Sequence, residues 1–414
     1  MEQQVSLMED GALIPLRVTS VGSRPQAAWA EGHRVHWPLS LFARTQWRTL
    51  LDGSGDLAIP SDPAPVRDDD VAALRERRAF TERPPLSARL PISYHWVPAP
   101  ARALAARSIG IWNRRRVDRW ASFPGWPIDL SADLLADIRS DARGILPSPF
   151  AAGTTPVVLT HDIDSAEGLT NLLAKFTPLE EAAGARSTSY VVPCAWPIDH
   201  ALVGDLVARG HGVGVHGYDH SNTTPFAGDE ERRRRLDAAR PLAERYGIIG
   251  YRAPSLLRTR ALLRDLGARY RYDSSIPTSG GLFPVPNNGC ATARPFVVEG
   301  IVELPLTLPR DGSLRFLGYS PDEIAQAWIE CAEIVGRSGG VVVLLTHCER
   351  RFSGHPYMLD AYRRFLDWVR GRPDRFAFSA PSDVIDRFSA GIAQASGLAG
   401  PGGHDRPHED GGAR

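Results

Sequence analysis

The feature that most limits how this chain can fold is an alternation of short apolar runs with helical patterns, which begins at Thr155. The apolar runs are rich in β-branched residues, and this alternation is typical of repeated β/α units that build a parallel sheet or barrel. The strands that we predict lie at 157–160, 188–192, 213–216, 248–251, 301–304, 341–346 and 376–379. Helices are predicted between these strands, for example at 201–209, 229–246, 260–266, 321–335, 358–370 and 381–388. A fold of this kind places its functional groups at the carboxyl ends of the strands.

The chain on either side of this region has a different texture. Residues 1–150 are rich in Pro, Arg and Trp and show little periodicity beyond a strand-like piece at 12–18 and a helix-like piece at 69–80. The end of the chain is rich in Gly and has almost no apolar content. We therefore predict an accessory region of unknown role (1–150), a catalytic domain (151–390) and a disordered tail (391–414).

Composition excludes several classes of protein. Of the 414 residues, 43% are hydrophobic and 23% charged, and 48 basic residues balance 48 acidic ones, which is typical of a globular chain without general attraction to nucleic acid. The four cysteines lie far apart and form no C-x-x-C pair, so we predict neither a zinc ribbon nor a disulfide framework. The sequence has no 18-residue apolar run and no basic, then apolar, N-terminus, so we expect no transmembrane segment and a cytoplasmic protein. The oligomeric state is not predicted.

Two carboxylates follow the first predicted strand. The run VVLT leads directly into HDIDS, so that Asp162 and Asp164 stand at a strand end and point to the same side if the strand continues. Like charges that close together need a cation or a proton between them. A D-x-D pair alone is weak evidence, because a helix cap or a solvated turn also explains it.

Two histidines follow a later predicted strand. His216 and His220 are four residues apart and can bind one metal ion from a helical turn or a tight loop, whereas His211 before them is expected to pack or face solvent. Asp164 is the natural third ligand, since its strand would neighbour theirs. One Asp and two His leave coordination positions open, as catalytic zinc sites do, and Asp162 fits the base that activates water.

The order of the motifs resembles the polysaccharide deacetylase family, also called the NodB-homology or carbohydrate esterase 4 group, over about residues 155–390. The family motifs T-x-D-x-D, H-[S/T]-x-x-H, R-x-P, Y-D-S-S and L-x-x-H match Thr160 with Asp162 and Asp164, His216 with His220, Arg252-Ala253-Pro254, Tyr272-Asp273-Ser274-Ser275, and Leu344-Leu345-Thr346-His347. The fold that we expect is α/β, a distorted (β/α)7-type barrel with an N-terminal accessory region.

The resemblance implies a role for each matching residue. The metal ligands are Asp164, His216 and His220, and the cofactor is a divalent ion, with zinc as the first choice although the ligand types do not distinguish it from other divalent ions. The catalytic residues are four: Asp162 as base, Arg252 to hold that base ionised, His347 as acid, and Asp273 to hydrogen-bond nearby groups, with its partner left open.

Some positions depart from the family pattern. Gly217 replaces the usual Ser or Thr, Ile163 separates the aspartates, and Cys348 follows His347 where proline is frequent, so the substrate need not be chitin or peptidoglycan. Cys348 as a nucleophile is disfavoured, since a buried free cysteine is commoner.

Four further residues have two interpretations each. Trp196 and Tyr218 fit either an aromatic platform for a sugar or ordinary packing, and Arg350 and Arg351 fit either a phosphate contact or a solvated charge run.

The function that we expect is N-deacetylation of an N-acetylated amino sugar or sugar conjugate. The alternatives are a deformylase or cyclic-amide hydrolase of the same family, and a catalytically inactive carbohydrate-binding protein.

Overall fold

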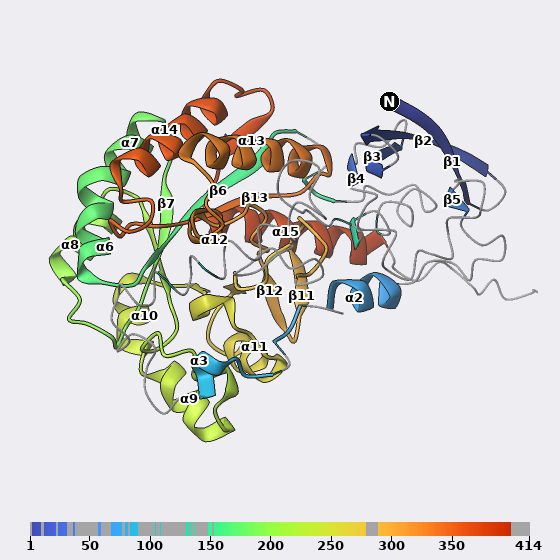
Figure 1. The fold of residues 1–414 in the computed structure, drawn as a ribbon. Coiled ribbons are helices and arrows are strands. Elements are labelled where there is room, and N and C mark those ends of the chain that lie inside the picture. Colours follow the sequence, from blue (N-terminus) through green and yellow to red (C-terminus); the bar gives the residue numbers. More distant parts are fainter. Residues whose placement is uncertain are drawn as a thin grey trace, which may run out of the picture.

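The structure is a computed structural model that describes residues 153–278 and 289–398 without a break (Figure 1). Before residue 153 it describes the strands at 2–9, 12–21, 24–30, 36–37 and 57–58, the stretches 68–76, 79–81, 83–89, 132–133 and 148–150, and the single residues 104, 108, 130 and 136.

A curled, mostly parallel sheet forms the centre of the molecule. Its nine strands run in the order β11-β12-β10-β9-β8-β7-β6-β13, with β14 pairing with β6. The strands are β6 (Thr155–Ile163), β7 (Ser187–Val191), β8 (Gly212–Val215), β9 (Gly250–Tyr251), β10 (Tyr272–Asp273), β11 (Phe296–Val298), β12 (Ile301–Glu303), β13 (Val342–His347) and β14 (Phe376–Phe378). All pair in parallel except β11, which is antiparallel to β12. The α/β class and the distorted (β/α)7-type barrel that we predicted are confirmed.

Helices cover the outside of this sheet, as Figure 1 shows for α6, α7, α8, α13 and α14. The helices of the barrel region are α6 (Ala166–Asn171), η3 (Leu172–Phe176), α7 (Thr177–Ala182), α8 (His200–Ala208), η4 (Thr224–Phe226), α9 (Asp229–Asp237), α10 (Arg240–Tyr246), η5 (Pro254–Leu256), α11 (Arg260–Gly267), α12 (Asp311–Phe316), α13 (Pro321–Arg337), α14 (Pro356–Arg370) and α15 (Pro381–Leu398). None of the helices in the described part of the chain is long and apolar enough to span a membrane.

The two faces of the sheet carry two separate apolar cores. On β6, Val157 and Leu159 pack outward with the helices, whereas Val158 packs inward with Tyr190 of β7 and Leu345 of β13. Because side chains alternate along a strand, Thr160 and Asp162 share the inward face of Val158. The strand ends therefore deliver their polar residues to the inside of the curled sheet.

Most predicted elements coincide with observed ones, but the predicted helix at 229–246 is wrong as a single element. It is divided into α9 and α10, because Pro241 cannot continue a helix without clashing with the carbonyl of residue 237. The short strands β10 and β11 were not predicted, and α6, α7 and α12 were not among the examples given for the helices between the predicted strands. The tail boundary at residue 390 is also corrected, since α15 continues to Leu398; residues 399–414 lie outside the described residues.

Before the barrel, five strands form a second sheet in the order β4-β3-β2-β1-β5. They are β1 (Glu2–Glu9), β2 (Ala12–Val21), β3 (Arg24–Ala30), β4 (His36–Trp37) and β5 (Leu57–Ala58), followed by the helices α2 (Asp68–Glu76) and α3 (Leu86–Arg89). The predicted pieces at 12–18 and 69–80 overlap β2 and α2.

Parts of the predicted accessory region pack directly on the barrel. Thr81 N donates a hydrogen bond to the carbonyl of Arg258 (2.7 Å), and Arg258 Nε donates to the carbonyl of Ala79. On another side, Ala293 N donates to Asp133 (2.8 Å). Ala79 and Leu130 are fully buried in the outer core. These segments contribute to the same core as the barrel.

Candidate active site

The three predicted metal ligands lie together at the carboxyl ends of the strands. One ligand atom from each of Asp164, His216 and His220 can be chosen so that all three lie within 4.8 Å of one another. His220 Nε2 is 3.1 Å and His216 Nε2 is 3.5 Å from Asp164 Oδ1. Two imidazole nitrogens and one carboxylate are a donor set of catalytic zinc sites, so these residues fit a divalent ion.

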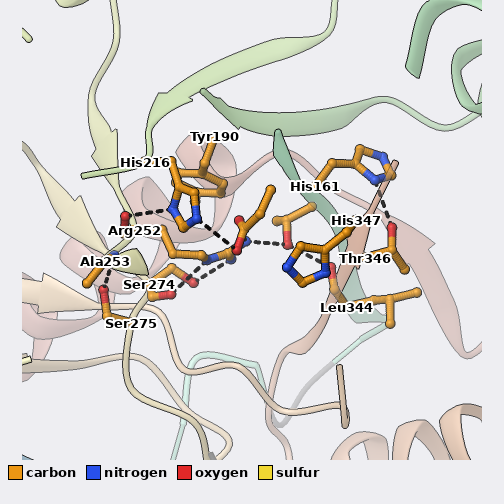
Figure 2. A network of polar contacts seen from close by, with 12 residues as sticks. His161, Tyr190, His216, Arg252, Ala253, Ser274, Ser275, Leu344, Thr346 and His347 are labelled. Atoms are coloured by element: carbon orange, nitrogen blue, oxygen red, sulfur yellow. Dashed lines mark hydrogen bonds and ion pairs between the residues drawn. The ribbon is translucent and has the colours of Figure 1, made fainter. Parts of the chain in front are cut away.

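A backbone hydrogen bond orients one of the imidazoles. His216 Nδ1 donates to the carbonyl of Arg252 (3.0 Å; Figure 2). Nε2 is thereby left with its lone pair facing Asp162 and Asp164. Burial lowers the pKa of His216, which favours the neutral ring. Outer hydrogen bonds of this kind fix the tautomer and direction of a metal-binding histidine.

Gly217 explains how the loop returns His220 to the site. Its φ of +70° lies in the left-handed region, and a Cβ at this position would lie 2.5 Å from the ring of Pro254. The departure from the Ser or Thr of the family is therefore required by this backbone path, since no side chain fits beside the R-x-P segment.

The predicted contact between Arg252 and Asp162 is confirmed. Arg252 Nη1 donates to Asp162 Oδ1 (3.1 Å) and to Thr160 Oγ1 (2.9 Å), and its other groups donate to the carbonyl (2.9 Å) and hydroxyl (3.0 Å) of Ser274. The guanidinium is fully buried, 4.1 Å from the ring centre of Tyr190 (Figure 2). A buried cation so held keeps the Asp162 carboxylate in place.

His347 takes its orientation from a residue that the sequence analysis missed. Asp311 of α12 accepts hydrogen bonds from His347 Nδ1 (2.8 Å), from the backbone N of His347 (2.8 Å) and from Ser353 Oγ (2.7 Å). Burial by itself would lower the pKa of His347, but the charge and hydrogen bond of Asp311 outweigh it and raise that pKa to about 9. In the sheet, His347 pairs in register with Asp162, so both face the same side.

The partner of Asp273, which the sequence left open, is Ser275. Its carboxylate accepts from Ser275 Oγ (2.7 Å), and Ser275 Oγ in turn accepts from Ala253 N (2.8 Å), so Asp273 supports the strand that carries Arg252. Tyr272 points inward to Tyr190, and alternation therefore turns Asp273 to the other face, where it pairs in register with Glu303. Burial raises the pKa of both carboxyl groups. In the described residues it is Asp311, not Asp273, that hydrogen-bonds His347.

Glu349 is a second residue that the sequence analysis missed. It is 4% exposed and accepts hydrogen bonds from the backbone N of Asp164 (3.1 Å) and from Ser165 Oγ (2.9 Å). Burial, and then the charge of Asp164, raise its pKa to about 7. The one sequence feature that could have pointed to Glu349 is its position two residues after His347.

The remaining candidates have plainer surroundings. Burial raises the pKa of Cys348 well above its usual value, which disfavours a reactive thiolate. Trp196 packs against the outer core, and the ring of Tyr218 lies under Arg235 (5.3 Å). The guanidinium of Arg351 lies over the ring of Phe352 (4.7 Å). Sugar or phosphate contacts by these residues, as by Arg350, stay predictions.

No protein-family model matches the chain, and no curated protein matches it. It is similar to solved structures that include a probable polysaccharide deacetylase from Pseudomonas aeruginosa PAO1 (16% identity, 61% of this chain and 97% of that chain covered, TM-score 0.46). Others are PuuE allantoinase (16%, 59% and 94%, 0.45) and a family 4 carbohydrate esterase from Streptomyces lividans in complex with acetate (19%, 55% and 93%, 0.36). Polysaccharide deacetylases and family 4 esterases are thus among the structures that this chain resembles, as the motifs predict. At these identities and TM-scores the similarity assigns no activity, which has to be argued from the site.

Proposed function

We propose that this protein is a metal-dependent amide hydrolase that removes an acetyl group from an N-acetylated amino sugar or sugar conjugate. The observation that most supports this proposal is that a carboxylate and a protonated imidazole lie beside the cluster of Asp164, His216 and His220. Asp162 is fixed by Arg252, and His347 is fixed by Asp311, on neighbouring strands in register. An amide needs both groups, because a nitrogen leaves only after it is protonated.

Each residue then has a defined task. A divalent ion, which we propose to be zinc, would be held by Asp164, His216 and His220 and would supply Lewis acidity toward the amide carbonyl and an acidified water. Asp162 accepts a proton from the attacking water. His347 gives its Nε2 proton to the departing nitrogen, because its Nδ1 proton is held by Asp311. The products are the carboxylic acid and the free amine, with one water consumed.

The test compares Asp164→Ala with Asp162→Asn for metal content and turnover. We expect Asp164→Ala to lose the metal, and Asp162→Asn to keep the metal and lose turnover, because only the first removes a ligand. Asp199→Asn, at the exposed cap of α8, is the matched control and should keep both. Full activity in both site variants would refute the proposal.

A panel of acyl donors separates the competing activities. Released acetate from N-acetylated sugars supports the proposal, released formate indicates a deformylase, and ring opening without a released acid indicates a cyclic-amide hydrolase. A zinc-loaded protein that binds the sugars but cleaves none of these donors would identify an inactive binding protein.

A further inference from the structure

The loop after β13 reaches across to the turn after β6 through one side chain. Glu349 Oε1 accepts from the backbone N of Asp164 and from Ser165 Oγ. Ser165 is the N-cap of α6, and its hydroxyl oxygen also accepts from Gly168 N (3.2 Å). A single carboxylate oxygen therefore ties the proposed ligand Asp164 to the first turn of the helix that follows it.

The surroundings are shaped around this carboxylate. A Cβ at Gly168 would lie 2.3 Å from Glu349 Oε1, so α6 admits the carboxylate only because that position is glycine. A heavy-atom contact that short is forbidden by sterics, and any other residue at 168 would displace Glu349.

The other end of Glu349 is held close to His347. Its carbonyl accepts from Phe352 N (2.9 Å) and Gly354 N (3.2 Å), and Ser353 N donates to the carbonyl of His347 (3.1 Å). Ser353 also donates through its hydroxyl to Asp311, the partner of His347. The loop from 347 to 354 is thus closed on itself, and Glu349 cannot move without moving the residues that orient His347.

We infer that Glu349 is a positioning residue that fixes the metal ligand Asp164 relative to the acid His347. This inference rests on the proposed function, since it takes Asp164 as a metal ligand. It adds a connection between two strand ends that the ligands themselves do not make. Glu349 acts here only as a hydrogen-bond acceptor, through Oε1. A side chain of the same length with an acceptor oxygen should therefore position Asp164 equally well.

The test measures zinc affinity by equilibrium competition with a chelator, which needs no substrate. Glu349→Gln keeps an acceptor oxygen of the same reach and should bind zinc within about threefold of the unaltered protein. Glu349→Leu removes the acceptor and should bind zinc roughly 10–100-fold more weakly, the usual effect of losing a residue that supports a metal ligand. If Glu349→Leu fails to fold, Glu349→Asp serves as the test, because it keeps the charge but has a side chain one methylene shorter. Its oxygen then falls short of Asp164 N, and zinc affinity should be about tenfold lower.

A control separates positioning from general stability. Glu180 is equally buried, but it bonds His161, Ser187 and Tyr362 on the outer side of the sheet. Glu180→Gln should lower the melting temperature and leave the zinc affinity of the folded protein unchanged.

Each outcome bears on one claim. Equal zinc affinity in the unaltered protein, Glu349→Leu and Glu349→Asp overturns the inference alone, and so does a Glu349→Gln variant as weak as Glu349→Leu. No zinc binding by the unaltered protein would overturn the proposed function itself.

Discussion

Replacing Asp311 by Asn should move the pH range in which His347 can act as an acid. In the unaltered protein the pKa of His347 is raised from 6.5 to about 9, a difference that corresponds to ~3 kcal/mol in favour of the protonated ring. The asparagine keeps an oxygen that can accept from Nδ1 but removes the charge. Burial, which lowers the pKa, is then opposed only by the more distant Asp164 and Asp162.

The direction follows from the sign of the shift. His347 is protonated below its pKa, so the acid is available at neutral pH and is lost as the pH rises through about 9. In Asp311→Asn this loss should occur at a pH lower by about 2, the larger part of the present shift. At pH 8 turnover should fall by roughly tenfold or more, while at pH 6 it should be much less affected.

The assay is an NMR titration of the His347 ring in the zinc-loaded protein, with the pH profile of kcat/KM beside it. Ser353→Ala, which removes a hydrogen bond to Asp311 without changing charge, should shift the titration far less. A His347 that titrates near 6.5 in the unaltered protein, or equally in Asp311→Asn, would refute the reasoning.

Three further substitutions test other parts of the site. Arg252→Lys keeps the positive charge but loses the planar guanidinium that donates several hydrogen bonds at once. The loss should raise the activation free energy by about 2 kcal/mol and lower kcat/KM by roughly 30-fold at unchanged zinc content. An unaltered kcat/KM would count against the contact with Asp162. Gly217→Ala places a Cβ against Pro254 at φ +70° and should lower the free energy of unfolding by about 1–3 kcal/mol in a denaturant titration. An unchanged free energy of unfolding would show that the loop takes another path. Cys348→Ala should keep kcat within about threefold, and a folded but inactive variant would restore the thiol as a candidate nucleophile.

The two long apolar strands are predicted well because their side chains are buried on both faces. The runs at 157–160 and 341–346 are apolar almost throughout because helices cover one face and the inner core the other. Their ends then locate Asp162, Asp164 and His347, since parallel strands all deliver their last residues to one edge.

The contact between His347 and Asp311 has no such pattern behind it. The two residues are 36 positions apart, and Asp311 lies in a short helix outside any predicted element. The chain has 48 acidic residues, and no motif singles out Asp311 among them. Only the packing of α12 against β13 selects one of them.

The partner of Asp273 is a second contact that the sequence left open. The motif Y-D-S-S marks Asp273 as a candidate, but β10 has only two residues and gives no alternation from which to assign faces. Its position beside Glu303 depends on the pairing of β10 with β12, two strands that are 28 or more residues apart in the chain. Local sequence cannot supply that.

The contacts of residues 79–81 and 130–133 have a consequence for dissecting this chain. The carbonyl of Arg258, four residues beyond Pro254, accepts from Thr81 N, and the Arg258 guanidinium donates to the carbonyl of Ala79. The backbone N of Ala293 donates to Asp133. A fragment cut at residue 151 would strip the outer core of Ala79 and Leu130 and leave a buried guanidinium short of an acceptor. We therefore expect a stable fragment to begin upstream of residue 79, well inside the region that looks accessory in the sequence.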